Sequence, residues 1–222
     1  MAQSNVARKP GRPVDEALQA RRRDEILDVA ERLFAERGYS ETDTQQIADA
    51  LGMSKGTVFR YFPTKRELFL GAVDRAMRQA TEYTRAKREV YSDPLEQMRH
   101  GIRAYLEFFA ERPGIVELLI QERAQFKDRK KPTYFEYQEA NIGRWRDTFR
   151  KLIADGRVRD VPVERITDVM CDLVYGTMFT NYFTGGRRPL EVQVEDILDI
   201  SFNGILTDEE QRRRGTLKKN AK

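Results

Sequence analysis

Apolar side chains recur every three to four positions along most of the chain, which is the spacing of an amphipathic α-helix. No stretch shows the strict alternation of a half-buried strand, so the pattern predicts an all-α protein. The longer helices are expected at about residues 18–37, 64–88, 95–109, 142–153, 162–184 and 190–206.

The segment after the first of these helices has short apolar runs and frequent turn residues. Asp43 or Thr44 can cap a short helix that closes at Gly52, and Ser54 can cap the next one. Two short helices joined by a tight turn form a helix-turn-helix, in which the second helix is presented outward. The first residues of that second helix, 55–57, are therefore expected to face base edges in DNA.

Two stretches carry a family resemblance: "ILDVAERLFAERGY" at 26–39 and "IADALGMSKGTVFRYFPTKREL" at 47–68. Together with their spacing they resemble the TetR/AcrR family of transcriptional regulators. The resemblance implies an all-α homodimer with an N-terminal three-helix helix-turn-helix DNA-binding domain. A larger helical domain would then bind a small-molecule effector and dimerise, and the DNA partner would be a double-stranded, pseudo-palindromic operator.

The resemblance also implies a division of the chain and a set of DNA contacts. The division is a flexible basic arm at 1–17, the DNA-binding domain at 18–66, the ligand-binding and dimerisation domain at 67–207, and a disordered basic tail at 208–222. The family's DNA contacts fall on Thr44, Gln45, Lys55, Gly56, Thr57, Phe59, Arg60, Tyr61 and Lys65.

The chemistry of these positions suits DNA. Lys65 lies near the start of a helix, where its ammonium group can hold a phosphate. Arg60 can form a bidentate pair with guanine, and Thr57 offers both a methyl and a hydroxyl group. Two positions depart from the family's pattern: Phe59 stands where tyrosine is usual, and Thr44 stands where an apolar residue is usual.

The N-terminal arm is a second candidate for DNA contact. Arg8, Lys9 and Arg12 lie among prolines and a glycine, and the Gly-Arg-Pro core resembles an AT-hook. Such a motif lays arginine in the narrow minor groove of A·T-rich DNA. The alternative is a mobile arm that adds only sequence-independent attraction.

Composition excludes several classes of protein. The 40 lysines and arginines exceed the 36 aspartates and glutamates by little, so net charge alone is weak evidence for an anionic partner. Cys171 and His100 are the only residues of their kinds, which excludes a disulfide framework or a Cys/His metal cluster within one chain. We find no nucleophile motif or phosphate-binding glycine loop, and therefore expect neither an enzyme nor a cofactor or metal.

The sequence also bears on location. The N-terminal stretch lacks the apolar run of a signal peptide, and no apolar run approaches the roughly 20 residues that span a bilayer. A single cysteine suits a reducing compartment. We expect a cytoplasmic protein without a membrane partner.

Within the larger domain, aromatic and methionine side chains could line an effector cavity, because they form adaptable apolar walls. The candidates are Tyr105, Phe109, Trp145, Phe149, Met170, Val174 and Met178. Each of them could equally be an ordinary core residue. A cavity of several hundred Å³ would favour a ligand-controlled repressor, whereas a filled domain would favour a ligand-independent architectural or cell-cycle DNA-binding protein.

Overall fold

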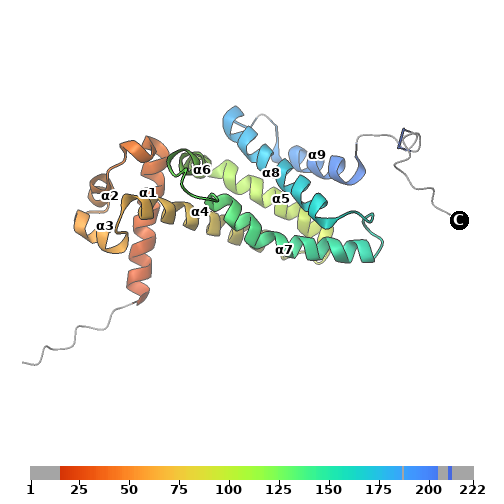
Figure 1. Ribbon diagram of the computed structural model, residues 1–222, viewed down its shortest axis with the longest axis horizontal. Coiled ribbons are helices and arrows are strands. Elements are labelled where there is room, and N and C mark those ends of the chain that lie inside the picture. The colour runs from red at the N-terminus through yellow and green to blue at the C-terminus, as the bar shows by residue number, and fades with distance from the viewer. Residues whose placement is uncertain (1–15, 187, 205–209, 212–222) are drawn as a thin grey trace, which may run out of the picture. The chain divides into compact units, whose positions relative to one another are not determined.

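The computed structural model describes residues 16–186, 188–204 and 210–211, and the regular elements in these ranges are all helices. They form two compact units that divide between Ala72 and Val73, inside one continuous helix (Figure 1). The domain boundary expected at residue 66 lies a short distance before this division. In the part of the chain that the structure describes, no helix is long and apolar enough to cross a membrane.

The first unit contains α1 (Glu16–Glu41), α2 (Thr44–Ala50), α3 (Lys55–Tyr61) and the first turns of α4 (Lys65–Arg88). Regular helical geometry in α1 breaks at Gly38, whose φ of 84° is a left-handed value that glycine adopts without steric cost. The predicted end of the first long helix at this glycine is therefore confirmed.

The core of the first unit joins all four of its helices. Its buried members are Ile26, Leu27, Ala30, Leu33, Phe34, Ile47, Ala48, Val58, Phe62, Leu68, Phe69 and Ala72. One close contact involves Gly71 on α4, where an added Cβ atom would lie 3.0 Å from Phe62 Cε1 and 3.3 Å from a methyl carbon of Leu27. The absence of a side chain at Gly71 thus lets α4 pack directly on the residue that follows α3.

The second unit contains the rest of α4 and five further helices. These are α5 (Pro94–Glu111), α6 (Pro113–Gln125), α7 (Thr133–Ala154), α8 (Val163–Thr184) and α9 (Leu190–Asn203). Helix α5 packs against α6, α8 and α9, and α7 packs against α8. The predicted positions of the last two helices are confirmed to within a few residues, and α8 ends at Gly185 with a left-handed φ of 72°.

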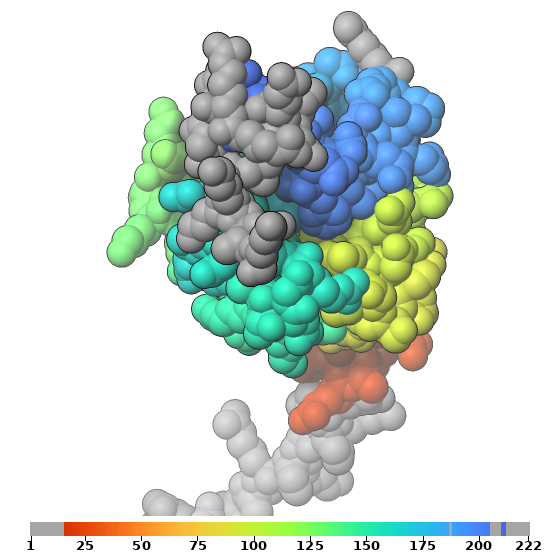
Figure 2. Space-filling model, turned by 90° about the vertical axis from the view of Figure 1, so that its right-hand side faces the viewer, coloured from red at the N-terminus to blue at the C-terminus, as the bar shows by residue number. Residues whose placement is uncertain are grey.

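Two ion pairs join α9 to α5. The Arg103 guanidinium lies 2.6 Å from the Glu191 carboxylate, and Arg99 pairs with Glu195 one helical turn away. Figure 2 shows this end of the second unit, where α9 lies against the first half of α5. The charged rows therefore fix the register between the two helices at the surface, while Val194 and Ile197 are buried beneath.

Helix α6 was not predicted from the sequence. The Pro113-Gly114 pair reads as the end of the preceding helix, but Pro113 is in fact the first residue of α6. Proline is tolerated there because the first backbone N–H groups of a helix have no intrahelical partner. The apolar residues of α6 also lie on more than one side, so no single stripe marks it.

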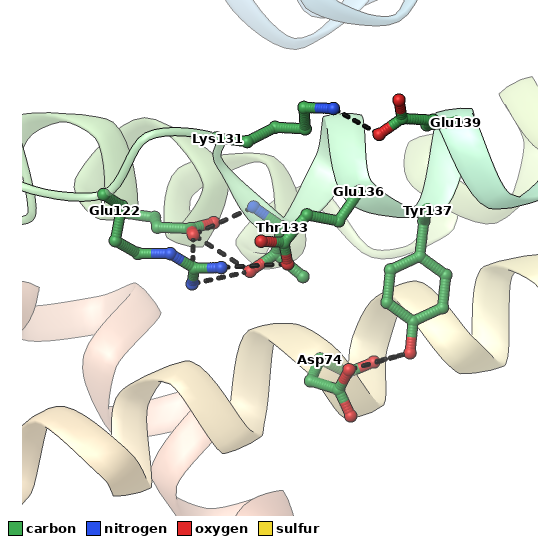
Figure 3. Close-up of polar contacts among 8 residues, drawn as sticks. Asp74, Glu122, Lys131, Thr133, Glu136, Tyr137 and Glu139 are labelled. Atoms are coloured by element: carbon green, nitrogen blue, oxygen red, sulfur yellow. Dashed lines mark hydrogen bonds and ion pairs between the residues drawn. The ribbon is translucent and has the colours of Figure 1, made fainter.

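The start of α7 is held by a carboxylate from α6. Glu122, only 1% exposed, accepts hydrogen bonds from the backbone N–H and the hydroxyl of Thr133, both at 2.9 Å (Figure 3). The Arg129 guanidinium lies 2.8 Å from the same carboxylate oxygen and also pairs with the exposed Glu136 at 2.9 Å. Because Pro132 offers no side-chain cap, Glu122 does the work of a capping residue from another helix.

Candidate nucleic-acid interface and effector cavity

Local hydrogen bonds fix where α2 begins. The Asp43 carboxylate accepts from the backbone N–H of Gln45 at 2.6 Å, and the Gln46 side chain accepts from the backbone N–H of Asp43 at 3.1 Å. This reciprocal pair is a capping box, so Asp43 is the cap and Thr44 the first helical residue. The two alternatives left open by the sequence are thereby resolved.

The turn between α2 and α3 uses one left-handed residue, Gly52, whose φ is 62°. Ser54 then caps α3, as predicted: its hydroxyl accepts from the backbone N–H of Thr57 at 3.1 Å. The two hydroxyl groups of Ser54 and Thr57 lie 2.9 Å apart. The Thr57 hydroxyl thus has a local partner in Ser54. The methyl group is the part of this side chain that is left for the expected DNA contact.

Most of the predicted DNA-contact residues have accessible side chains or backbone. Gln45, Gly56, Phe59 and Arg60 are exposed, and Lys55, Thr57, Tyr61 and Lys65 are half-buried. Thr44 differs, because it is only 4% exposed and belongs to the core side of α2. Its side chain therefore offers a DNA partner almost no surface. The predicted arm residues Arg8, Lys9 and Arg12 lie outside the described residues.

Two of the candidate lysines have protein partners. Lys55 Nζ lies 2.9 Å from Asp43 Oδ1. The backbone hydrogen bond from Gln45 and the Lys55 ammonium both hold the pKa of Asp43 below its usual value. Lys65 Nζ donates to the Ser40 carbonyl at 3.1 Å and lies over the Tyr39 ring at 4.6 Å.

The environment of Lys65 also affects its charge. Burial lowers the pKa of the Lys65 ammonium, against the attraction of Asp43 and Glu41. An ammonium group has three N–H donors, so the bond to the Ser40 carbonyl leaves capacity for a phosphate oxygen.

A cavity of about 200 Å³ lies inside the second unit, among α4, α5, α7 and α8. Five of the seven residues predicted to line such a cavity do so: Tyr105, Trp145, Phe149, Met170 and Val174. Phe109 and Met178 are buried in the core and are not part of its lining. The Tyr105 hydroxyl points at the Met178 sulfur, 3.6 Å away, which places Met178 behind the cavity wall.

The polar part of the cavity lining was not found from the sequence. It includes Thr84, Arg88, Tyr137, Gln138 and Asn141. Hydrophobic periodicity selects the apolar face of a helix, and these side chains lie at the edges of such faces. The sequence of one helix does not indicate which of its two edges contacts a neighbouring helix, because that depends on how the helices pack.

Tyr137 connects the cavity to α4. Its hydroxyl donates to the Asp74 carboxylate at 2.8 Å and lies 3.2 Å from the Asp74 carbonyl oxygen (Figure 3). Burial, followed by the bond to Asp74, raises the pKa of Tyr137 to about 12. The phenol is therefore protonated, and acts as a donor, at neutral pH.

A capped, outward-facing α3 that follows α2 across a glycine turn defines a helix-turn-helix DNA-binding protein. Residues 26–72 match the sequence model for bacterial regulatory proteins of the tetR family. The chain is therefore similar to this family over most of α1 and the residues that form α2, α3 and the first turns of α4.

Curated relatives divide into two kinds. The nucleoid occlusion factor SlmA of Actinobacillus pleuropneumoniae is 27% identical over 129 residues, which cover 54% of this chain and 64% of that protein. The chain thus matches less than two thirds of the length of SlmA. The HTH-type transcriptional repressor KstR2 of Mycolicibacterium smegmatis is 27% identical over 192 residues, covering 84% of this chain and 91% of the relative.

Solved structures share the fold. The transcriptional regulator FadR of Bacillus subtilis, crystallised in complex with stearoyl-CoA, superposes with a TM-score of 0.70 at 17% identity. The match covers 82% of this chain and 99% of FadR. At this level of identity the likeness extends to the fold alone.

Proposed function

We propose that the protein is a dimeric, sequence-specific transcriptional repressor that leaves its operator when a small, largely apolar effector enters the cavity. This proposal rests on one observation, that a candidate DNA-binding surface and a candidate effector cavity occur in one chain. An exposed recognition helix lies in the first unit, and a cavity with mostly apolar walls lies in the second. As a regulator of bacterial DNA the protein would act in the cytoplasm, and no catalytic step is required of it.

Helix α4 offers the physical link between these two parts. It begins with Lys65, a candidate phosphate contact, and runs without interruption to Arg88, which lines the cavity. Met77, Ala80, Thr81 and Thr84 on the same helix line the cavity as well. An effector that favours one tilt of α4 over another can therefore change the position of the recognition helix.

Exposed apolar side chains on the last two helices support the dimer. Val169, Leu173, Phe183, Val192, Ile200 and Phe202 are all exposed, and Phe183 reaches 70%. A cluster of this kind on two neighbouring helices is typical of a surface that pairs with a second copy. Gly176 has open space around it and would allow close approach. Ile205, the next apolar residue along the chain after Phe202, lies outside the described residues.

The similarity to SlmA keeps a second function in view, that of a ligand-independent architectural DNA-binding protein. The cavity argues against it, because a domain that only dimerises gains stability from a filled core. At about 200 Å³ the cavity is smaller than the several hundred Å³ expected for a ligand-controlled repressor, so the proposal is restricted to a small effector.

Selection of operator sites from random duplex DNA, with and without candidate effectors, tests the proposed function. We expect enrichment of a pseudo-palindrome whose half-sites are centred roughly one helical turn apart, about 34 to 40 Å. We also expect release of the selected DNA by at least one apolar effector. Enrichment without any preferred sequence would contradict the proposed function. Specific binding that no effector weakens would instead favour the architectural alternative.

Lys65 and Thr57 should differ in their effects on DNA binding. Replacing Lys65 with glutamine should weaken binding to all sequences and reduce the salt slope by about one, as expected for a lost phosphate contact. Replacing Thr57 with serine keeps the hydroxyl bond to Ser54 and removes only the methyl group, so discrimination at one base pair should relax. Titrations of operator and unrelated DNA at several salt concentrations measure both. Wild-type affinity and slope in the Lys65 variant would refute the phosphate contact.

A further inference from the structure

Arg88 places a positive charge at the wall of a mostly apolar cavity. It is the one charged side chain among the residues that line the cavity, all of which belong to the described part of the chain. Its guanidinium carbon lies 5.1 Å from the centre of the Trp145 ring. Gly101 faces both side chains and leaves them room, since an added Cβ atom there would lie 3.7 Å from Arg88 and 3.8 Å from Trp145.

Within the described residues, no carboxylate forms a close ion pair with this guanidinium. The neighbouring carboxylate, Glu89, pairs instead with Arg144 at 2.7 Å. The buried Nε–H of Arg88 has no hydrogen-bond acceptor there. Burial and the nearby Arg144 both lower the pKa of the Arg88 guanidinium, against the attraction of Glu89.

A second polar group lies one helical turn away. Thr84 is four residues before Arg88 on α4, lines the same cavity, and has a buried hydroxyl oxygen without a partner among the described residues. Residues four apart lie on the same face of a helix. Arg88 and Thr84 therefore present unused hydrogen-bond donors to one end of the cavity, while Phe149, Met170 and Val174 provide apolar walls.

A half-buried charge and a buried hydroxyl without partners are costly, and a ligand that satisfies both would remove that cost. We propose that the effector is an amphipathic carboxylate, with its carboxylate bound by Arg88 and Thr84 and its apolar body against the walls. A planar carboxylate matches the two parallel N–H groups of a guanidinium. This inference rests on the proposed function, because it names the class of molecule that the same cavity would take.

The fluorescence of Trp145 can measure ligand binding in the cavity. This residue is the only tryptophan of the chain, and it contacts both the cavity and Arg88, so its fluorescence reports occupancy directly. Octanoate is the probe, and octanamide is a neutral molecule of nearly the same shape. We expect octanoate to bind about 10- to 100-fold more tightly than octanamide, the range for a hydrogen-bonded charged pair.

Arg88→Gln is the decisive variant. It should lower the affinity for octanoate to that for octanamide and leave octanamide binding unchanged, because only the charge pair is lost. Arg85→Gln is the matched control, since Arg85 is an exposed arginine of the same helix that does not line the cavity. It should keep the wild-type preference. Arg85→Gln should also bind operator DNA like the wild type in the absence of a probe.

Three results would overturn the inference: equal binding of the two probes, a preference that survives in Arg88→Gln, or no binding of either probe. None of these decides the proposed function. That function fails separately, if the wild-type protein selects no operator sequence or if no apolar compound of any charge releases it.

Discussion

Replacing Glu122 with alanine should destabilise the second unit by about 3 kcal/mol. The substitution removes a buried carboxylate that accepts three hydrogen bonds or ion pairs, from the Thr133 backbone, the Thr133 hydroxyl and Arg129. It leaves the first N–H of α7 without a partner, and it leaves the largely buried Arg129 guanidinium with only the exposed Glu136 and the Thr133 hydroxyl. The carboxylate also lies at the positive end of the α7 dipole, which adds to the loss.

The chain offers an unusually well-matched control, because Glu136 pairs with the same guanidinium from the solvent side. Its side chain is 50% exposed, so Glu136→Ala should cost less than about 1 kcal/mol. Urea unfolding followed by Trp145 fluorescence measures both variants, since Trp145 lies on α7 itself. If the two substitutions proved equally costly, the capping role of Glu122 would be refuted.

The second large effect is expected for Tyr137→Phe. This substitution should reduce how far a bound effector weakens operator binding, rather than the binding of the effector. An effector that weakens operator binding about 100-fold requires a coupling free energy of about 2.7 kcal/mol. The bond from Tyr137 to the exposed Asp74 carboxylate is worth about 1.4 kcal/mol, near the lower end for hydrogen bonds to charged groups. Without it, the same effector should weaken operator binding only about tenfold.

Tyr83→Phe is the control for this prediction. The Tyr83 hydroxyl donates to the Glu107 carboxylate at 3.0 Å, so it also joins α4 to another helix, but it does not line the cavity. Operator affinity measured with and without a saturating effector gives the coupling for each variant. A full response in Tyr137→Phe, or an equal loss in Tyr83→Phe, would exclude a specific role for Tyr137.

The pH dependence of the Tyr137 bond follows from the direction of its pKa shift. The pKa is raised, to about 12, so the folded protein holds this proton more tightly than the unfolded chain. The stabilisation is then complete below the ordinary tyrosine pKa of about 10 and disappears as the pH rises through 12. The effector response should therefore not change between neutral pH and about pH 9 through this group.

The fold could be predicted well where a signal lies within one helix. Gly38, Gly52, Ser54 and Gly185 each mark a helix end through their own backbone or side chain, and each prediction agrees with the structure. Helix α6 was not predicted because its apolar residues are buried on several sides and so form no single apolar face in the sequence.

Contacts between side chains of different helices could not be predicted from the sequence, and this limits how much of each site could be predicted. Glu122 caps a helix that begins 11 residues later, and Tyr137 reaches Asp74 63 residues away. Arg88 reads in the sequence as one of several charges at the end of a helix. Only the packing of α4 against α5 and α7 distinguishes it from the exposed Arg85. The sequence therefore identified apolar residues of the cavity lining and missed its polar residues.

The close contact at Gly71 has a mechanical consequence. Because a Cβ atom there would lie 3.0 Å from the Phe62 ring, the backbone of α4 packs closely on the residue that caps the end of α3. Tight packing of this kind transmits displacement instead of absorbing it. The first turns of α4 and the recognition helix α3 should therefore move together as one rigid body. A small rotation of α4 would then displace α3.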